Sequence, residues 1–148
     1  MIRLTKEFTF ESAHALWGYD GKCREIHGHS YRLFVTVKGH PSEECGDPKL
    51  GMVMDFGVLK SIVERQIISR LDHSFVMRRT PEALSLAESM KDSFSNIVLV
   101  DYQPTCENML YDFADRLRAA LPKGVELHSL RLHETARSYA EWYAEDNR

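Results

Sequence analysis

The segment from Cys23 to Tyr31 places several side chains capable of chemistry close together. His27 and His29 are one residue apart and lead into an alternating apolar run, so we expect a β-strand there. Residues i and i+2 of a strand point to the same side, which would put both imidazoles on one face. Two neighbouring imidazoles are a metal-ligand arrangement, although the same pattern also fits two polar strand residues.

A third ligand could come from the first predicted strand. Residues 2–14 alternate between apolar and polar side chains, and His14 continues the apolar phase at the strand end. Pairing of strands 2–14 and 27–39 is favoured by their short connection and would complete a three-histidine set. Cys23 leaves two possibilities open: a fourth ligand of a closed structural site, or a thiol that moves protons beside a cationic centre.

Three further positions carry groups suited to acid–base chemistry or substrate binding. Asp72 and His73 are adjacent at an expected helix end, where a carboxylate can orient an imidazole, although such pairs are also commonplace there. Glu134 shares the phase of the last strand's apolar residues, so it faces inward and needs donors, such as an amino-pyrimidine edge. Glu107 in a first helical turn ordinarily complements the helix dipole.

Periodicity and turn residues predict the elements that position these groups. We expect strands over residues 2–14, 27–39 and 96–102 and from 125 onward, the last with a bulge near His128–Ser129. We expect helices from Asp55, as N-cap, to about residue 72, over 80–96, and from about 105 to 121. This order is typical of an α+β fold, most simply a four-stranded antiparallel sheet with two helices on one face. Its free edges and uncovered face favour oligomerisation.

Composition limits the function classes. The 148 residues suit one domain spanning residues 1–148, and a net charge of −3 argues against a nucleic-acid surface. The longest aliphatic run, at 97–100, is too short for a membrane span, and the N-terminus lacks an apolar signal core, so we expect a cytoplasmic protein. Three widely spaced cysteines predict neither disulfides nor a four-cysteine zinc site.

Six ordered motifs resemble the 6-pyruvoyltetrahydropterin synthase / 6-carboxytetrahydropterin synthase family over nearly the whole chain. They are Phe10-Glu11-Ser12-Ala13-His14, Cys23-x-x-x-His27-Gly28-His29, Met54-Asp55-Phe56, Leu71-Asp72-His73, Pro104-Thr105-x-Glu107-Asn108 and Glu134-Thr135. The resemblance implies a tunnelling fold, in which the sheets of three subunits form a barrel and two trimers stack into a hexamer. It also implies 7,8-dihydroneopterin triphosphate as the substrate.

The resemblance also implies roles for the matching residues. The implied zinc ligands are His14, His27 and His29, and the implied catalytic cysteine is Cys23. Asp72 and His73 match a proton-relay pair supplied by a neighbouring subunit. The implied pterin pocket contains Glu134, Glu107 and Thr105.

The three residues between Cys23 and His27 resemble the bacterial carboxy branch of the family. This branch implies formation of 6-carboxy-5,6,7,8-tetrahydropterin with loss of triphosphate and acetaldehyde, a step toward queuosine-type 7-deazapurines. Two other products stay open: a 6-pyruvoyl pterin, or a 6-hydroxymethyl pterin for folate, for which some members use a glutamate, here Glu25. A solvated loop acid is the simpler interpretation of Glu25. A protein of a different class, a zinc-stapled module that binds a pterin or purine without turnover, is the remaining alternative.

Overall fold

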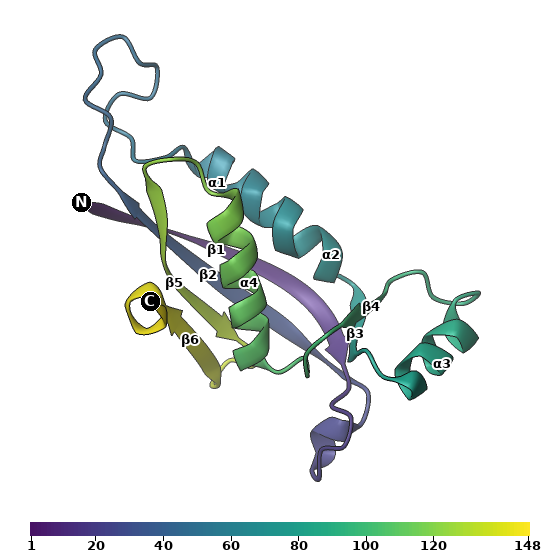
Figure 1. Cartoon of the computed structure of the whole chain (residues 1–148). Helices are drawn as coiled ribbons and strands as arrows, with labels where there is room; N and C mark the ends of the chain where they lie inside the picture. Colours follow the sequence, from purple (N-terminus) through teal and green to yellow (C-terminus); the bar gives the residue numbers. More distant parts are fainter.

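The computed structural model describes residues 1–148 as a curled sheet with its long helices packed on one face (Figure 1). The strands are β1 (Ile2–His14), β2 (His27–Gly39), β3 (Ser74–Arg78), β4 (Ile97–Val100), β5 (Val125–His133) and β6 (Tyr139–Tyr143). The α-helices are α1 (Phe56–Val63), α2 (Ser69–Leu71), α3 (Pro81–Met90) and α4 (Cys106–Ala120). A π-helical segment, Glu64–Ile68, joins α1 to α2, and short 3-10 turns occupy Lys22–Arg24 and Ala144–Asn147.

The sheet has six strands in the order β4-β3-β1-β2-β5-β6. Strands β1, β2, β5 and β6 form an antiparallel series, whereas β3 pairs in parallel with both β1 and β4. The predicted four-stranded antiparallel sheet is therefore wrong, because the sheet is mixed and has two more strands. The sequence signal for β3 is weak because the strand has five residues and no glycine or proline separates it from the preceding helix. Strand β6 also has only five residues, which include the charged Glu141.

The β1–β2 ladder runs over the full length of both strands. Ile2 lies opposite Gly39 at one end and His14 lies opposite His27 at the other. The predicted bulge in β5 is confirmed, since Thr36 pairs with Ser129 and Val37 with Leu127, which leaves one extra residue between the two partners.

Side-chain caps start the helices where the sequence predicts them. The Asp55 side chain accepts a hydrogen bond from the Gly57 amide at 2.6 Å, and Thr80 accepts one from the Ala83 amide at 3.1 Å. Thr105 caps α4 by accepting from the Asn108 amide at 3.4 Å. The start of α4 lies beside the end of the sheet that carries His14, because Nδ1 of His14 donates to the carbonyl of Pro104, the residue before this cap.

One hydrophobic cluster of 26 buried residues joins the sheet to its helices. Phe10 of β1, Leu33 of β2 and Phe113 of α4 are all within it. The opposite face of the sheet has no helix over it (Figure 1) and carries polar cross-strand pairs such as Arg32–Glu7 at 2.7 Å. None of the helices has the length and apolar composition that a membrane crossing requires.

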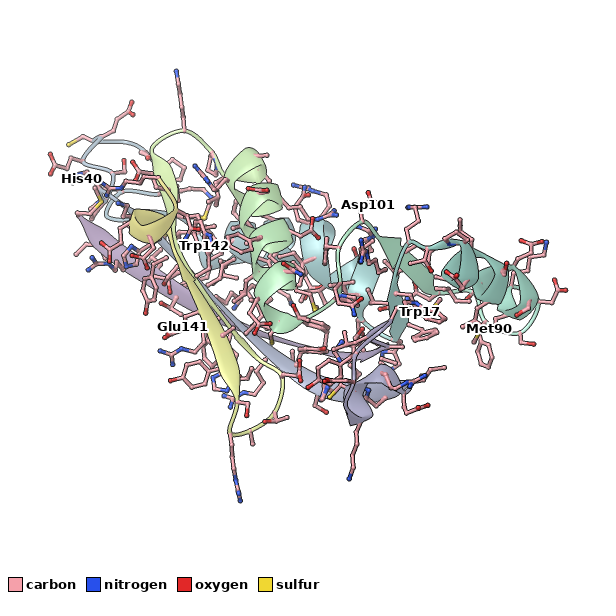
Figure 2. All side chains as sticks on the ribbon, turned by 60° about the horizontal axis from the view of Figure 1, so that its bottom comes forward. Trp17, His40, Met90, Asp101, Glu141 and Trp142 are labelled. Carbon is pink, nitrogen blue, oxygen red and sulfur yellow. The ribbon has the colours of Figure 1, made fainter.

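Helix α3 lies outside the packed body of the protein. Figure 2 shows it projecting at the end marked by Met90, opposite the loop that carries His40. Of its residues only Ala83 is buried. The return from α3 leads into β4, which pairs with β3 and so approaches the Asp72–His73 segment.

Candidate metal centre and adjoining cavity

Strands β1 and β2 bring three histidines together at one end of the sheet. His14 and His27 are register partners, and His29 lies two residues further along β2 on the same face. One ligand atom from each residue lies within 4.8 Å of those of the other two. This is the only such group of histidine, cysteine or acidic residues, and it contains the three predicted metal ligands.

Backbone carbonyls hold two of the rings in a ligating orientation. Nδ1 of His14 donates to the Pro104 carbonyl at 2.8 Å, and Nδ1 of His27 donates to the Glu25 carbonyl at 2.7 Å. Metal-binding histidines commonly donate the other ring nitrogen in this way, which fixes the tautomer. The two Nε2 atoms therefore face each other at 2.9 Å, as two lone pairs directed at a common ion would.

The third ring carries an unsatisfied nitrogen. Nε2 of His29 is buried without a hydrogen-bond partner, and its nearest acid, Oε1 of Glu134, is 3.4 Å away. Burial lowers the pKa of His14 and of His29, and in both cases it outweighs the opposing charge of Glu134. Both imidazoles are thus neutral at neutral pH, the form that binds metals. The donor set fits a divalent ion such as Zn²⁺.

A cavity of about 310 Å³ adjoins the three-histidine cluster and is lined by His14. Its other lining groups include Cys23 from the first 3-10 turn and Glu134 from just beyond β5. Thr105 and Glu107, from the start of α4, lie in the same wall. The structure therefore brings all three predicted pocket residues together with the predicted catalytic cysteine.

Cys23 and Glu25 differ sharply in where their side chains lie. Cys23 is half-buried and lines the cavity. The Glu25 side chain is 79% exposed, lies outside the cavity lining, and its only ion pair is with Arg24 at 3.8 Å. Cys23 also lies outside the cluster of potential ligand atoms, which favours an open three-ligand site over a closed four-ligand one.

Asp72 and His73 form a pair, but not inside this cavity. Nδ1 of His73 is 3.1 Å from Oδ1 of Asp72, and that oxygen also accepts the Glu11 amide at 3.0 Å. This amide is the main reason why the pKa of Asp72 is lowered, so the carboxyl remains ionised. His73 is 79% exposed and lines a separate hollow with His29. Within one subunit the pair is therefore not brought into the cavity that holds Cys23.

Sequence reasoning missed other residues of the cavity wall. Tyr19, Cys106 and Tyr139 also line it. Burial, followed by the nearby Glu134, raises the pKa of the Cys106 thiol to about 12, which keeps it protonated. Only Tyr139 had a signal, since it belongs to the aromatic segment at 138–142, whereas nothing local marks Tyr19 or Cys106 as facing a cavity.

Replacing His27 by alanine is expected to remove the metal and the stability that the metal supplies. A ligand present at about 100 times its dissociation constant stabilises a protein by about 2.7 kcal/mol. The measurement is metal content by mass spectrometry, with the melting temperature taken with and without EDTA. His40→Ala is the matched control, because His40 is exposed on a loop. Equal metal content in the two variants would contradict the assignment.

Known proteins resemble this chain over almost its full length. A family model described as 6-pyruvoyl tetrahydropterin synthase matches residues 3–145. The protein named 6-carboxy-5,6,7,8-tetrahydropterin synthase from Haemophilus influenzae is 36% identical, over 96% of this chain and 99% of that protein. The protein of the same name from Synechocystis sp. is 32% identical, over 94% and 91%. An uncharacterized protein from Wolinella succinogenes has a solved structure with a TM-score of 0.76 and 26% identity, over 97% and 98%.

Proposed function

The chain belongs to the 6-pyruvoyl tetrahydropterin synthase family, and we propose that it is a zinc-dependent 6-carboxytetrahydropterin synthase. Its substrate would be 7,8-dihydroneopterin triphosphate, and its products 6-carboxy-5,6,7,8-tetrahydropterin, triphosphate and acetaldehyde. The product would lead toward 7-deazapurines of the queuosine type. The names of two relatives more than 30% identical support this branch of the family.

The observation that carries the proposal is the difference between Cys23 and Glu25. The thiol of Cys23 shares a cavity with His14 and Glu134, whereas the carboxylate of Glu25 points into solvent beside Arg24. A proton-transfer group must come within hydrogen-bond reach of the substrate. This geometry favours the cysteine as the acid–base group, and so favours the carboxy product over the hydroxymethyl product.

His14, His27 and His29 would hold the zinc ion, which when bound supplies Lewis acidity to the hydroxyl groups of the substrate side chain. Three protein ligands leave a coordination position open for these hydroxyls. The carbonyls of Pro104 and Glu25 keep the rings of two ligands in place.

Glu134 is suited to anchor the ring of a pterin. It lines the cavity beside Thr105 and Glu107 and is 27% exposed, so part of its carboxylate is available to a ligand. A carboxylate accepts two parallel N–H bonds, which the amino-pyrimidine edge of a pterin donates. The side chain of such a substrate would then extend toward His14 and Cys23.

Cys23 and the Asp72–His73 pair would move protons on opposite sides of the substrate side chain. Asp72 holds the imidazole of His73 through the 3.1 Å contact. Because His73 lies outside the cavity of its own subunit, we propose that it serves the cavity of a neighbouring one. The uncovered sheet face and the edge strands β4 and β6 offer surfaces for the oligomeric barrel that this requires.

Product identity tests the function directly. The protein, loaded with zinc, is incubated with 7,8-dihydroneopterin triphosphate, and the pterin is identified by mass spectrometry. A 6-carboxy pterin is expected, and Glu25→Gln is expected to give the same product at a similar rate. A product that keeps the three-carbon side chain would instead assign the pyruvoyl reaction. If the wild type forms a 6-hydroxymethyl pterin and Glu25→Gln does not, Glu25 is the catalytic group. Binding without turnover would indicate a non-catalytic module.

A further inference from the structure

Asn96 contacts the backbone of both residues of the acid–base pair. Its Nδ2 donates to the carbonyl of Asp72 at 3.3 Å and to the carbonyl of His73 at 3.2 Å. Its own carbonyl accepts the amide of Phe75 at 3.0 Å. Asn96, the residue just before β4, therefore contacts three backbone positions between α2 and β3, namely Asp72, His73 and the strand residue Phe75.

The backbone that Asn96 contacts is in an uncommon conformation. His73 has φ +57°, and it is the only residue other than glycine with a positive φ. Such a conformation is unfavourable for most L-residues and persists where surrounding contacts enforce it. The His73 amide donates to the Glu11 carbonyl at 2.6 Å, which fixes one side of this residue. Asn96 fixes the other side, at the carbonyl.

The direction of the His73 ring depends on this backbone. The ring is 79% exposed, and its one polar contact is the carboxylate of Asp72. No packing around the ring would correct its direction if the peptide between Asp72 and His73 rotated. The side-chain amide of Asn96 opposes that rotation, because it donates to the carbonyls on both sides of His73 Cα.

We propose that Asn96 is a positioning residue for the Asp72–His73 pair, and that its amide N–H groups set the direction in which His73 presents its imidazole. The inference rests on the proposed function, in which this pair moves protons. It also gives a role to the segment between Arg79 and Asn96, which contains α3: this segment brings Asn96 back to the backbone of the pair.

The test distinguishes the effect of the N–H donors of Asn96 from the effect of its side-chain shape. Asn96→Asp keeps the shape but can only accept hydrogen bonds at neutral pH, so it places a carboxylate against two carbonyls. Asn96→Ser keeps one donor, and Asn96→Ala keeps none. We expect kcat to decrease in the order wild type, Asn96→Ser, Asn96→Ala, Asn96→Asp. The loss is expected to be roughly 10-fold or more for Asn96→Ala and Asn96→Asp, because small misplacements of reacting groups cost up to ~100-fold in rate. The KM of every variant is expected to stay within about 2-fold of the wild type.

Asn147→Ala is the matched control, because Nδ2 of Asn147 also donates to a backbone carbonyl, that of Tyr143 at 2.8 Å, far from the pair in sequence. It is expected to keep the kcat of the wild type. A second readout needs no substrate: hydrogen exchange of the His73 amide is expected to accelerate in Asn96→Ala and Asn96→Asp, and not in Asn147→Ala. This readout stays valid if the proposed reaction fails.

Two results would overturn the proposal. In the first, Asn96→Ala and Asn96→Asp keep the kcat of the wild type or leave exchange of the His73 amide unchanged. In the second, the kcat of the Asn96 variants falls only as much as their folded fraction does, and Asn147→Ala shows an equal loss. The Asn96 contact would then be merely structural. Asn96 is at the surface, where water can hydrogen-bond to the freed carbonyls without holding them in place, so the variants are expected to remain folded.

Discussion

Cys23→Ala is expected to lose nearly all turnover while the protein keeps its metal. Removing a general acid–base group typically costs about 10²–10⁴-fold in rate. The metal is expected to stay because the three histidines form the ligand cluster without this cysteine. The measurements are kcat with 7,8-dihydroneopterin triphosphate and metal content by mass spectrometry on the same preparation.

Cys45→Ala is the matched control, since Cys45 is a free and exposed thiol on the loop after β2. It should match the wild type in both rate and metal content. If Cys23→Ala instead loses the metal and unfolds, Cys23 is a fourth ligand and the site is a closed structural one. If turnover persists with metal bound, another group moves the proton.

His73→Asn is expected to reduce turnover by about 10²–10⁴-fold with little change in stability. Asparagine adopts positive φ more readily than most residues, so the backbone at φ +57° can persist. The free energy of unfolding is therefore expected to change by less than about 1 kcal/mol, as for most surface substitutions. Chemical denaturation and steady-state kinetics check both parts, with His40→Asn as the control at an exposed histidine.

Mixing the two inactive variants tests whether a neighbouring subunit supplies His73. If it does, unfolding and refolding Cys23→Ala together with His73→Asn restores activity, because some cavities then combine an intact cysteine with an intact histidine. If both groups act within one subunit, the mixture stays as inactive as its components. The position of His73 outside the cavity lined by Cys23 leads us to expect restoration.

The candidate metal centre could be predicted from the sequence because it depends on the local periods of two strands. Alternation over residues 2–14 and 27–39 predicts both strands, and the i, i+2 period places His27 and His29 on one face. A short connection makes antiparallel pairing of these strands favourable, which brings His14 opposite His27. The caps at Asp55 and Thr80 and the bulge in β5 were predicted on equally local grounds.

The sheet's architecture required the tertiary structure. Strand β3 is stabilised by pairing with β1 and β4, which are remote from it in sequence. The five residues of β3 therefore carry no local pattern that distinguishes a strand from a loop. The same holds for β6 against β5, where the local pattern indicates only an aromatic segment. Local periodicity thus predicted the long central strands, and non-local pairing added the short outer ones.

The motif order of this chain, by itself, determined the family and the three histidines that could hold a metal ion, because residue type and strand period are both read from neighbouring residues. The directions of Cys23 and Glu25 were decided only by the fold. Both residues lie in one short loop, and the turn at Lys22–Arg24 directs the thiol into the cavity and leaves the carboxylate in solvent. Side-chain direction in an irregular loop has no period, so only the tertiary contacts of that loop could assign it.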